Sequence, residues 1–191
     1  MKANWMTVMR KQFGDAFTGD APLAPLTTLK VGGPARGLLT VTDIPSLQEA
    51  LRLLEKYRVP YLVLGRGANL IVPDEGFKGL VIQLRGEFET IERLKTVKKA
   101  VYLRAGAGLS LPRLVAYAAR HGLSGLEPLT AIPGTVGGAI VMNAGVPGFS
   151  ISERLSSVTC LASPQKLVKR YANQLRPAYR DMRLPRNRIV L

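Results

Sequence analysis

The chain has 191 residues, of which 47% are hydrophobic and 21% are charged, so its composition is that of a globular rather than a disordered protein. The length suits one medium-sized domain or two small ones. No apolar run reaches the ~18 residues that span a bilayer, and the start lacks the apolar stretch of a signal peptide. The single cysteine, Cys160, excludes an intrachain disulfide and fits a reducing compartment. We therefore predict a cytoplasmic protein with no membrane segment.

The net charge of +14 is unevenly distributed. Residues 161–191 contain eight basic residues and one acidic residue, and they contribute half of the net charge. Such a segment is a solvated basic face, a field that attracts an anionic ligand such as a nucleotide or a pyrophosphate, or a nucleic-acid surface. Basic and aromatic residues are not interleaved as they are in surfaces that bind single strands. We therefore predict no nucleic-acid partner.

The first half of the chain alternates helical and extended patterns. Residues 4–17 have apolar side chains at helical spacing, which predicts a leading helix. Pro22 and Pro25 then predict an extended linker. The remaining elements are strands over 38–41, 59–64 and 79–84, a helix over 43–57, a tight loop over 65–69 and extended chain over 70–72.

The second half begins with two predicted strands and continues into a helix over 111–121, where His121 and Gly122 lie at the expected end. We predict a capping role for His121 and burial as a small hydrophobic residue for Cys160. Neither a metal-ligand cluster nor a nucleophile–base pair is visible, so we predict no metal site. The predicted strands of this half cover 88–94, 97–104, 158–161 and 188–191.

This alternation of strands and helices argues for an α/β or α+β fold. We divide the chain into an N-terminal helix (1–19), a first lobe (20–85) and a second lobe (86–191). Each lobe contains one glycine-rich element.

The first glycine element (residues 62–70) reads Leu-Val-Leu-Gly-Arg-Gly-Ala-Asn-Leu. Glycine allows a positive φ and a close approach of backbone amides to a phosphate. Arg66 adds a charge, and Asn69 can bond its own backbone. A simple turn between strands explains the pattern equally well. It is not a Rossmann fingerprint, because the third glycine is missing and Leu70 continues as a strand.

The second glycine element (residues 132–145) reads Ile-Pro-Gly-Thr-Val-Gly-Gly-Ala-Ile-Val-Met-Asn-Ala-Gly. Its many small residues make a poor core segment and suit backbone lying against a planar or phosphate-bearing ligand. Pro133 could begin a helix, and the free amides of residues 134–137 would then suit an anion. The alternative is a glycine-rich packing crossover.

Several motifs together resemble the UDP-N-acetylenolpyruvoylglucosamine reductase (UDP-N-acetylmuramate dehydrogenase) family. The resemblance covers about residues 26–191, and the second glycine element is its most specific part. The other motifs, in the order of the family, are residues 27–35, 64–70, 74–79, 104–108 and 122–127.

The resemblance implies an α+β fold, namely the two-lobed FAD-binding domain of the vanillyl-alcohol-oxidase (PCMH) type, with FAD between the lobes. It places the pyrophosphate on Gly65, Arg66, Gly67, Ala68, Asn69 and Leu70. It places the isoalloxazine near the second element, at Ile132, Pro133, Gly134, Thr135, Gly137, Gly138, Asn143, Ala144 and Gly145.

The implied activity is reduction of the enolpyruvyl group of UDP-N-acetylglucosamine enolpyruvate to the lactyl group of UDP-N-acetylmuramate. Hydride passes from NADPH to FAD and then to this UDP-sugar substrate. The reaction belongs to peptidoglycan synthesis, and hence to cell-wall biogenesis, cell shape and division.

Tyr179 and Arg180 match the Tyr-Arg pair of the family, whose arginine helps hold the substrate carboxylate. Guanidinium suits that role because it stays charged and binds carboxylates bidentately. This sequence departs from the family at Ala68, where a serine is usual, and at Asp181 and Met182, where small hydroxyl residues are common. The C-terminal substrate domain of the family, with its serine proton donor and late glutamate, has no counterpart here.

Three functions therefore stay open: the reductase in a shortened form, a module that binds FAD without turnover, and a basic nucleic-acid-binding protein. The last leaves the glycine elements unexplained. Because the proton donor is missing, we expect no turnover by these residues alone. Oligomeric state is not predictable from the sequence.

Overall fold

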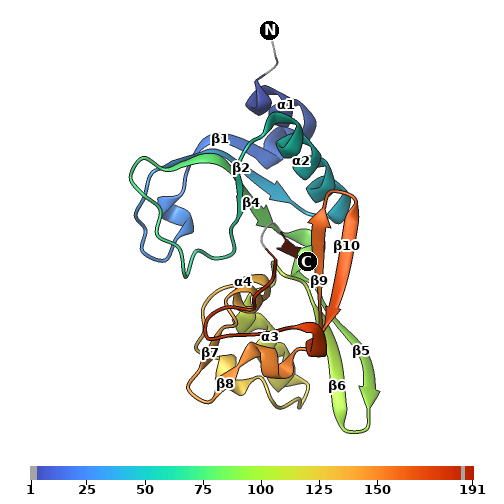
Figure 1. Ribbon diagram of the computed structural model, residues 1–191. Coiled ribbons are helices and arrows are strands. Elements are labelled where there is room, and N and C mark those ends of the chain that lie inside the picture. The colour runs from blue at the N-terminus through green and yellow to red at the C-terminus, as the bar shows by residue number, and fades with distance from the viewer. Residues whose placement is uncertain (1–3, 186–187) are drawn as a thin grey trace. The chain divides into compact units, whose positions relative to one another are not determined.

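The computed structural model describes residues 4–185 and 188–191, so Arg186 of the basic segment lies outside the described residues. The chain divides into two compact units, Met1–Gly86 and Glu87–Leu191 (Figure 1). Helices and strands occur in both units, and the leading helix belongs to the first of them.

Unit 1 contains a four-stranded sheet in the order β1-β2-β4-β3. Strand β1 (Phe17–Pro22) is antiparallel to β2 (Pro34–Val41), while β4 (Phe77–Leu84) is parallel to both β2 and β3 (Tyr61–Val63). The prediction of a linker at Pro22 is wrong, since this residue is the last one of β1. A proline without an N–H is tolerated there because β1 is an edge strand.

Two helices pack against this sheet and against each other, α1 (Trp5–Phe13) and α2 (Ile44–Tyr57). Helix α2 begins as predicted, because the Asp43 carboxylate accepts a hydrogen bond from the Ser46 amide at 2.7 Å and satisfies one free N–H of the first turn. Its buried stripe consists of Leu47, Ala50, Leu51 and Leu54.

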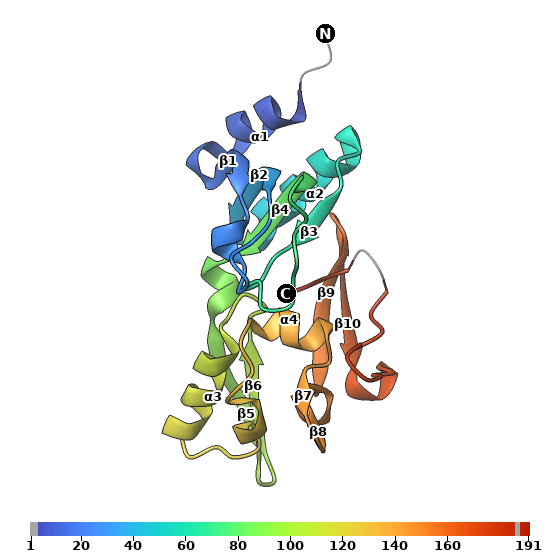
Figure 2. The same cartoon turned by 90° about the vertical axis from the view of Figure 1, so that its left-hand side faces the viewer.

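Unit 2 contains the antiparallel pair β5 (Ile91–Val97) and β6 (Ala100–Ala105) and a three-stranded antiparallel sheet in the order β10-β9-β11 (Figure 2). The sheet is formed by β9 (Ser157–Ser163), β10 (Lys166–Tyr171) and β11 (Ile189–Val190). The sequence did not predict β10, because its lysine and arginine residues obscure the alternation.

Two helices and a small hairpin complete unit 2. They are α3 (Leu111–Arg120), α4 (Val136–Val141), β7 (Gly145–Val146) and β8 (Phe149–Ser150). His121 is the C-cap of α3, as predicted, and its Nδ1 lies 2.8 Å from the Tyr117 carbonyl oxygen.

Among the described residues, no helix is long and apolar enough to cross a bilayer. Single turns of 3₁₀-helix cover Gly14–Ala16, Ala24–Leu26, Gly86–Glu89, Glu127–Leu129, Ile151–Arg154 and Ala172–Gln174.

Candidate functional site

The first glycine element forms a tight loop between β3 and β4 in unit 1. Leu64 is buried, and its amide donates to the Ile82 carbonyl at 2.8 Å, which continues the pairing of β3 beyond its last residue. Gly67 has φ +62°, and a Cβ atom added there would lie only 2.7 Å from the Thr27 Cα. Its carbonyl accepts the Thr28 amide at 3.1 Å. Glycine is therefore required at this position by both conformation and space.

The loop 26–34 lies directly against the chain at 67–76. The Gly33 amide donates to the Pro73 carbonyl at 2.9 Å. A Cβ atom on Gly32 would lie 2.5 Å from the Val72 Cβ, and one on Gly33 would overlap the Asp74 carbonyl oxygen. These contacts explain why residues 26–34 and 67–76 form one structural element although they are far apart in sequence.

The outer face of the first glycine element exposes Arg66, Ala68 and Asn69. Within the described residues the Asn69 amide makes no hydrogen bond, so the predicted bond to its own backbone is not found. No acidic side chain occurs between residues 62 and 72, and Arg66 supplies a positive charge. Such a loop, with exposed donors and no carboxylate, fits a phosphate group.

The second glycine element enters α4 later than predicted. The helix begins at Val136 rather than at Pro133, and Thr135 is its N-cap. The amides of Val136 and Gly137 donate to the carbonyls of Leu109 and Ala107 at 2.8 and 2.9 Å. The prediction that the amides of residues 134–137 are free for an anion is therefore wrong for these two residues, because the neighbouring chain already accepts their hydrogen bonds.

The glycines of this element have two different roles. Gly137 is buried, and a Cβ atom there would lie 2.7 Å from the Ala107 Cβ, so it permits close packing against the 104–108 motif. A Cβ atom on Gly138 would touch only the Thr135 Oγ1, at 3.4 Å, and one on Gly134 would meet nothing within 4 Å. Gly134 and Gly138 therefore leave open backbone surface, which suits the close approach of a planar ring.

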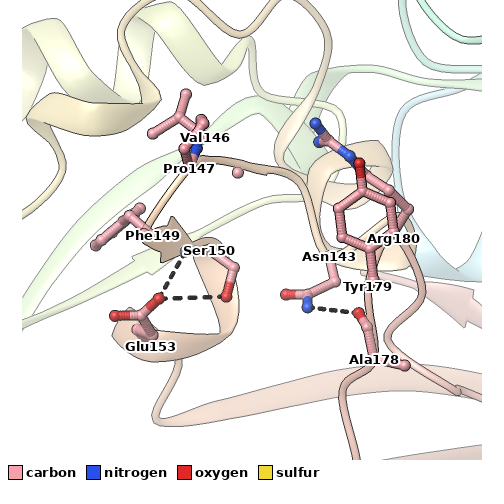
Figure 3. A pocket seen from close by; sticks show the side chains of 11 residues that line it. Asn143, Val146, Pro147, Phe149, Ser150, Glu153, Ala178, Tyr179 and Arg180 are labelled. Carbon is pink, nitrogen blue, oxygen red and sulfur yellow. Dashed lines mark hydrogen bonds between the residues drawn. The ribbon is translucent and has the colours of Figure 1, made fainter.

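A hollow of ≈ 550 Å³ lies within unit 2, between the β7–β8 hairpin and the turn at residues 178–181 (Figure 3). Its volume is in the range of small-molecule sites. The hollow brings together four of the predicted site residues, Asn143, Gly145, Tyr179 and Arg180. Its other lining residues are Val146, Pro147, Gly148, Phe149, Ser150, Glu153 and Ala178.

The arginine turn (residues 178–181) is closed by a reciprocal pair of backbone hydrogen bonds. The Ala178 amide donates to the Asp181 carbonyl at 2.7 Å, and the Asp181 amide donates to the Ala178 carbonyl at 3.2 Å. Tyr179 is 89% exposed, and the Arg180 guanidinium lies 5.5 Å from the centre of its ring. Arg180 has no hydrogen bond or ion pair within residues 4–185 and 188–191, so its charge is available to a ligand.

Sequence reasoning missed the β7–β8 hairpin as a wall of the hollow. Ser150 and Glu153 belong to a capping box, in which Glu153 Oε1 accepts the Ser150 amide at 2.7 Å. The guanidinium of Arg154 lies 5.1 Å from the ring centre of Phe149. The sequence pattern that could have predicted this hairpin is Gly145-Val146-Pro147-Gly148, because its small and turn-forming residues are typical of a hairpin turn.

Cys160 is 1% exposed in the middle of β9, which confirms its predicted burial. Burial raises the pKa of its thiol, against the opposing effect of the Arg188 and Arg170 guanidinium groups. The described residues contain no cluster of histidine, cysteine and carboxylate side chains that could hold a metal ion.

Residues 35–166 match the FAD binding domain family, and this match covers more than half of the chain. The chain belongs to this family. FAD is thus the cofactor of the family, as predicted, and both glycine elements lie within the matched residues.

Curated relatives extend the comparison. The chain is 40% identical over 163 residues to UDP-N-acetylenolpyruvoylglucosamine reductase 2 of Symbiobacterium thermophilum, covering 85% of this chain and 51% of the relative. It is 42% identical over 170 residues to UDP-N-acetylenolpyruvoylglucosamine reductase of Geotalea uraniireducens, covering 89% and 55%. The chain thus spans about half the length of the curated relatives it matches, and the predicted resemblance is confirmed.

Solved structures agree with the sequence comparison. The crystal structure of UDP-N-acetylenolpyruvylglucosamine reductase from Thermus caldophilus has a TM-score of 0.76 and 42% identity, covering 89% of this chain and 58% of that one. The structure of p-cresol methylhydroxylase has a TM-score of 0.58 at 13% identity, covering 86% and 34%, and shows the fold alone. The predicted α+β fold of the vanillyl-alcohol-oxidase (PCMH) type is therefore confirmed.

Proposed function

We propose that this chain is the FAD-binding part of a UDP-N-acetylenolpyruvoylglucosamine reductase, which reduces UDP-N-acetylglucosamine enolpyruvate to UDP-N-acetylmuramate with NADPH. The observation that carries the proposal is the match of residues 35–166 to the FAD binding domain family together with about 40% identity to reductases of that name. We place this role in the cytoplasm, and a single cysteine that forms no disulfide fits such a reducing compartment.

The residues fit FAD in both glycine elements. We assign the pyrophosphate to the loop 65–70, where Arg66 and Asn69 are exposed and which itself contains no acidic residue. We assign the isoalloxazine to the second glycine element, where Gly134 and Gly138 leave backbone uncovered. When bound, FAD supplies the hydride chemistry, which no side chain of the protein can perform.

Arg180 is the residue of this chain that we assign to the substrate. Addition of a hydride to the enolpyruvyl alkene places negative charge on the carboxylate as an enolate. A fixed cation stabilises that charge more than it stabilises the ground state, which accelerates the reaction. Arg180 has no hydrogen bond or ion pair among the described residues and lines the hollow, so its guanidinium can bind this carboxylate, with the Tyr179 ring beside it.

A near-ultraviolet and visible absorbance spectrum of the purified chain, with and without added FAD, tests the cofactor assignment. Flavin bands that stay with the protein after gel filtration are the expected result. A folded chain that retains no flavin would contradict the proposal.

Turnover is tested separately, by following NADPH oxidation that depends on the enolpyruvyl substrate. We assign no proton donor to this chain, so we expect flavin binding without turnover. Substrate-dependent oxidation of NADPH would show that a residue of this chain provides the proton, and variants of the hydroxyl and carboxyl groups of the hollow would then identify it.

A further inference from the structure

The arginine turn is attached to the end of α4 on both of its sides. Before the turn's tip, the Asn143 Nδ2 atom donates a hydrogen bond to the Ala178 carbonyl at 2.9 Å, drawn as a dashed line in Figure 3. After it, the Met182 amide donates to the Val141 carbonyl at 3.1 Å. Tyr179 and Arg180 therefore project from a loop that the second glycine element holds at both ends.

The burial, hydrogen bonds and backbone conformation of Asn143 all suit its contact with Ala178. Its side chain is 8% exposed, and its Oδ1 accepts the Ser152 amide at 3.4 Å, so both ends of the amide have partners. Its φ is +41°, in the left-handed region that asparagine tolerates better than most residues. An amide group buried without its partner would be destabilising, so the bond to Ala178 is maintained in the folded state.

The turn needs this support because its conformation is strained. Arg180 has φ +56° and Arg183 has φ +53°, and neither is a glycine. Such conformations persist only where the surrounding structure holds them. Met182 between them is fully buried, whereas Tyr179 and Arg180 are exposed and form no hydrogen bond or ion pair with other described residues.

We propose that Asn143 is a positioning residue, which holds the arginine turn and thereby sets the place of the Arg180 guanidinium at the hollow. Because Ala178 and Ser152 occupy both ends of its side-chain amide, we assign Asn143 to the turn and no longer to the isoalloxazine, where the family resemblance placed it. The consequence for substrate binding rests on the proposed function, in which Arg180 binds the carboxylate. The attachment of the turn can be tested without that function.

Two variants separate the hydrogen bond from the backbone conformation. Asn143→Gly tolerates a positive φ and deletes the amide, while Asn143→Asp keeps the acceptor for Ser152 and loses the donor to Ala178. We expect hydrogen-exchange protection of the Asp181 and Met182 amides to fall about tenfold in both variants at neutral pH, the order expected for one lost hydrogen bond. Protection of the β9 amides, which belong to the same unit but take no part in the hydrogen bonds that hold the turn, serves as the control for global destabilisation.

The pH dependence of hydrogen-exchange protection in the Asn143→Asp variant tests the hydrogen bond to the Ala178 carbonyl specifically. Once the Asp carboxyl is protonated, its O–H can donate to the Ala178 carbonyl. We expect protection at Met182 to recover as the pH falls through the titration of that carboxyl, and to stay low in Asn143→Gly. Equal protection in both variants and the wild type, or loss at β9 as large as the loss at Met182, would overturn the proposal.

The wild-type chain provides a test that needs no variant. Exchange of the Asn143 side-chain amide protons is compared with that of Asn69, which is exposed and has no partner within the described residues. We expect the Asn143 protons to exchange more slowly. Exchange of both side chains at the same rate would contradict the hydrogen bond.

Titration of the FAD-loaded chain with UDP-N-acetylglucosamine enolpyruvate links the turn to the substrate. We expect Asn143→Gly to weaken binding about tenfold, without change in flavin absorbance, and to add little in combination with Arg180→Ala, because coupled residues are not additive. If Arg180→Ala weakens binding and Asn143→Gly does not, the positioning role is wrong. If Arg180→Ala has no effect, the assignment of Arg180 itself fails, while the exchange data still decide whether Asn143 holds the turn.

Discussion

Both glycine elements lie within the residues that match the FAD binding domain family, yet their glycines have different structural roles. In the first, Gly67 is indispensable to the fold of its own loop, and the neighbouring side chains of Arg66 and Asn69 remain exposed. In the second, the amides of Val136 and Gly137 and the side chain of Asn143 are already hydrogen-bonded within unit 2. The first element therefore offers polar groups to a ligand, whereas the second offers open backbone and holds other residues in place.

The largest effect is expected from Gly67→Ala. A methyl group there would approach the backbone of residues 26 and 27 and would occupy a positive φ, so the loop must move. We expect the free energy of unfolding to fall by about 2–4 kcal/mol, from backbone strain and overpacking together. Urea denaturation measures this change. Wild-type stability in this variant would mean that the close approach to residues 26 and 27 is not a real constraint.

Gly138→Ala is the matched variant in the second element. Its methyl group would be 3.4 Å from Thr135 Oγ1 and otherwise open to solvent, and alanine favours a helix over glycine by up to about 1 kcal/mol. We expect stability to be unchanged or slightly higher, while FAD binding weakens because the methyl group covers open backbone. Fluorescence titration with FAD gives the affinity. Unaltered affinity would remove Gly138 from the flavin surface.

The helix caps of the two units also differ, because α2 begins at a carboxylate and α4 at a hydroxyl. Asp43→Ala should cost about 1 kcal/mol of stability. Hydrogen bonds from Ser46 hold the pKa of Asp43 below its ordinary value of 3.8. Its contribution is thus present above pH 3.8 and is lost as the pH falls through the lower folded-state pKa.

Comparing acid unfolding of Asp43→Asn with that of the wild type isolates this effect, since asparagine also caps helices but does not titrate. We expect the stability of Asp43→Asn to depend less on pH in the acid range. An unchanged dependence would show that other carboxylates account for it.

The smallest effect is expected at alkaline pH, in unit 2. Burial raises the pKa of Cys160 above its ordinary value of 9.0, so the unfolded state loses this proton first. The contribution to stability is therefore complete below pH 9.0 and is lost as the pH rises through the folded-state pKa. Denaturation of the wild type and of Cys160→Ala at several alkaline pH values tests this, and parallel curves would contradict it.

The sequence predicted the amphipathic helices well because their apolar stripes and caps are local signals. Asp43 and the apolar stripe from Leu47 to Leu54 place α2 within one residue of its observed start. Strand β1 was missed because Pro22 is typical of a linker, and only the pairing with β2 shows that an edge position tolerates it.

The candidate site was predictable by residue but not by arrangement. Motif resemblance identified Asn143, Tyr179 and Arg180, yet no pattern in the sequence indicates that an asparagine bonds a carbonyl 35 positions later. In the same way, the amides of Val136 and Gly137 could be recognised as occupied only when the chain at 107–109 was seen beside them. Long-range hydrogen bonds depend on tertiary packing, which short-range periodicity does not encode.

The two loops of unit 1 at 26–34 and 67–76 contact each other closely, and Gly32, Gly33 and Gly67 lie where the backbone of one loop meets the Val72 side chain or the backbone of the other. An insertion beside Gly32, Gly33 or Gly67 would displace the facing loop, in contrast to ordinary surface loops, which accept extra residues readily. For protein engineering, these loops behave as a single block, to be transplanted between homologous proteins together or not at all. A chimera that exchanges only one of them brings together two backbones that do not fit.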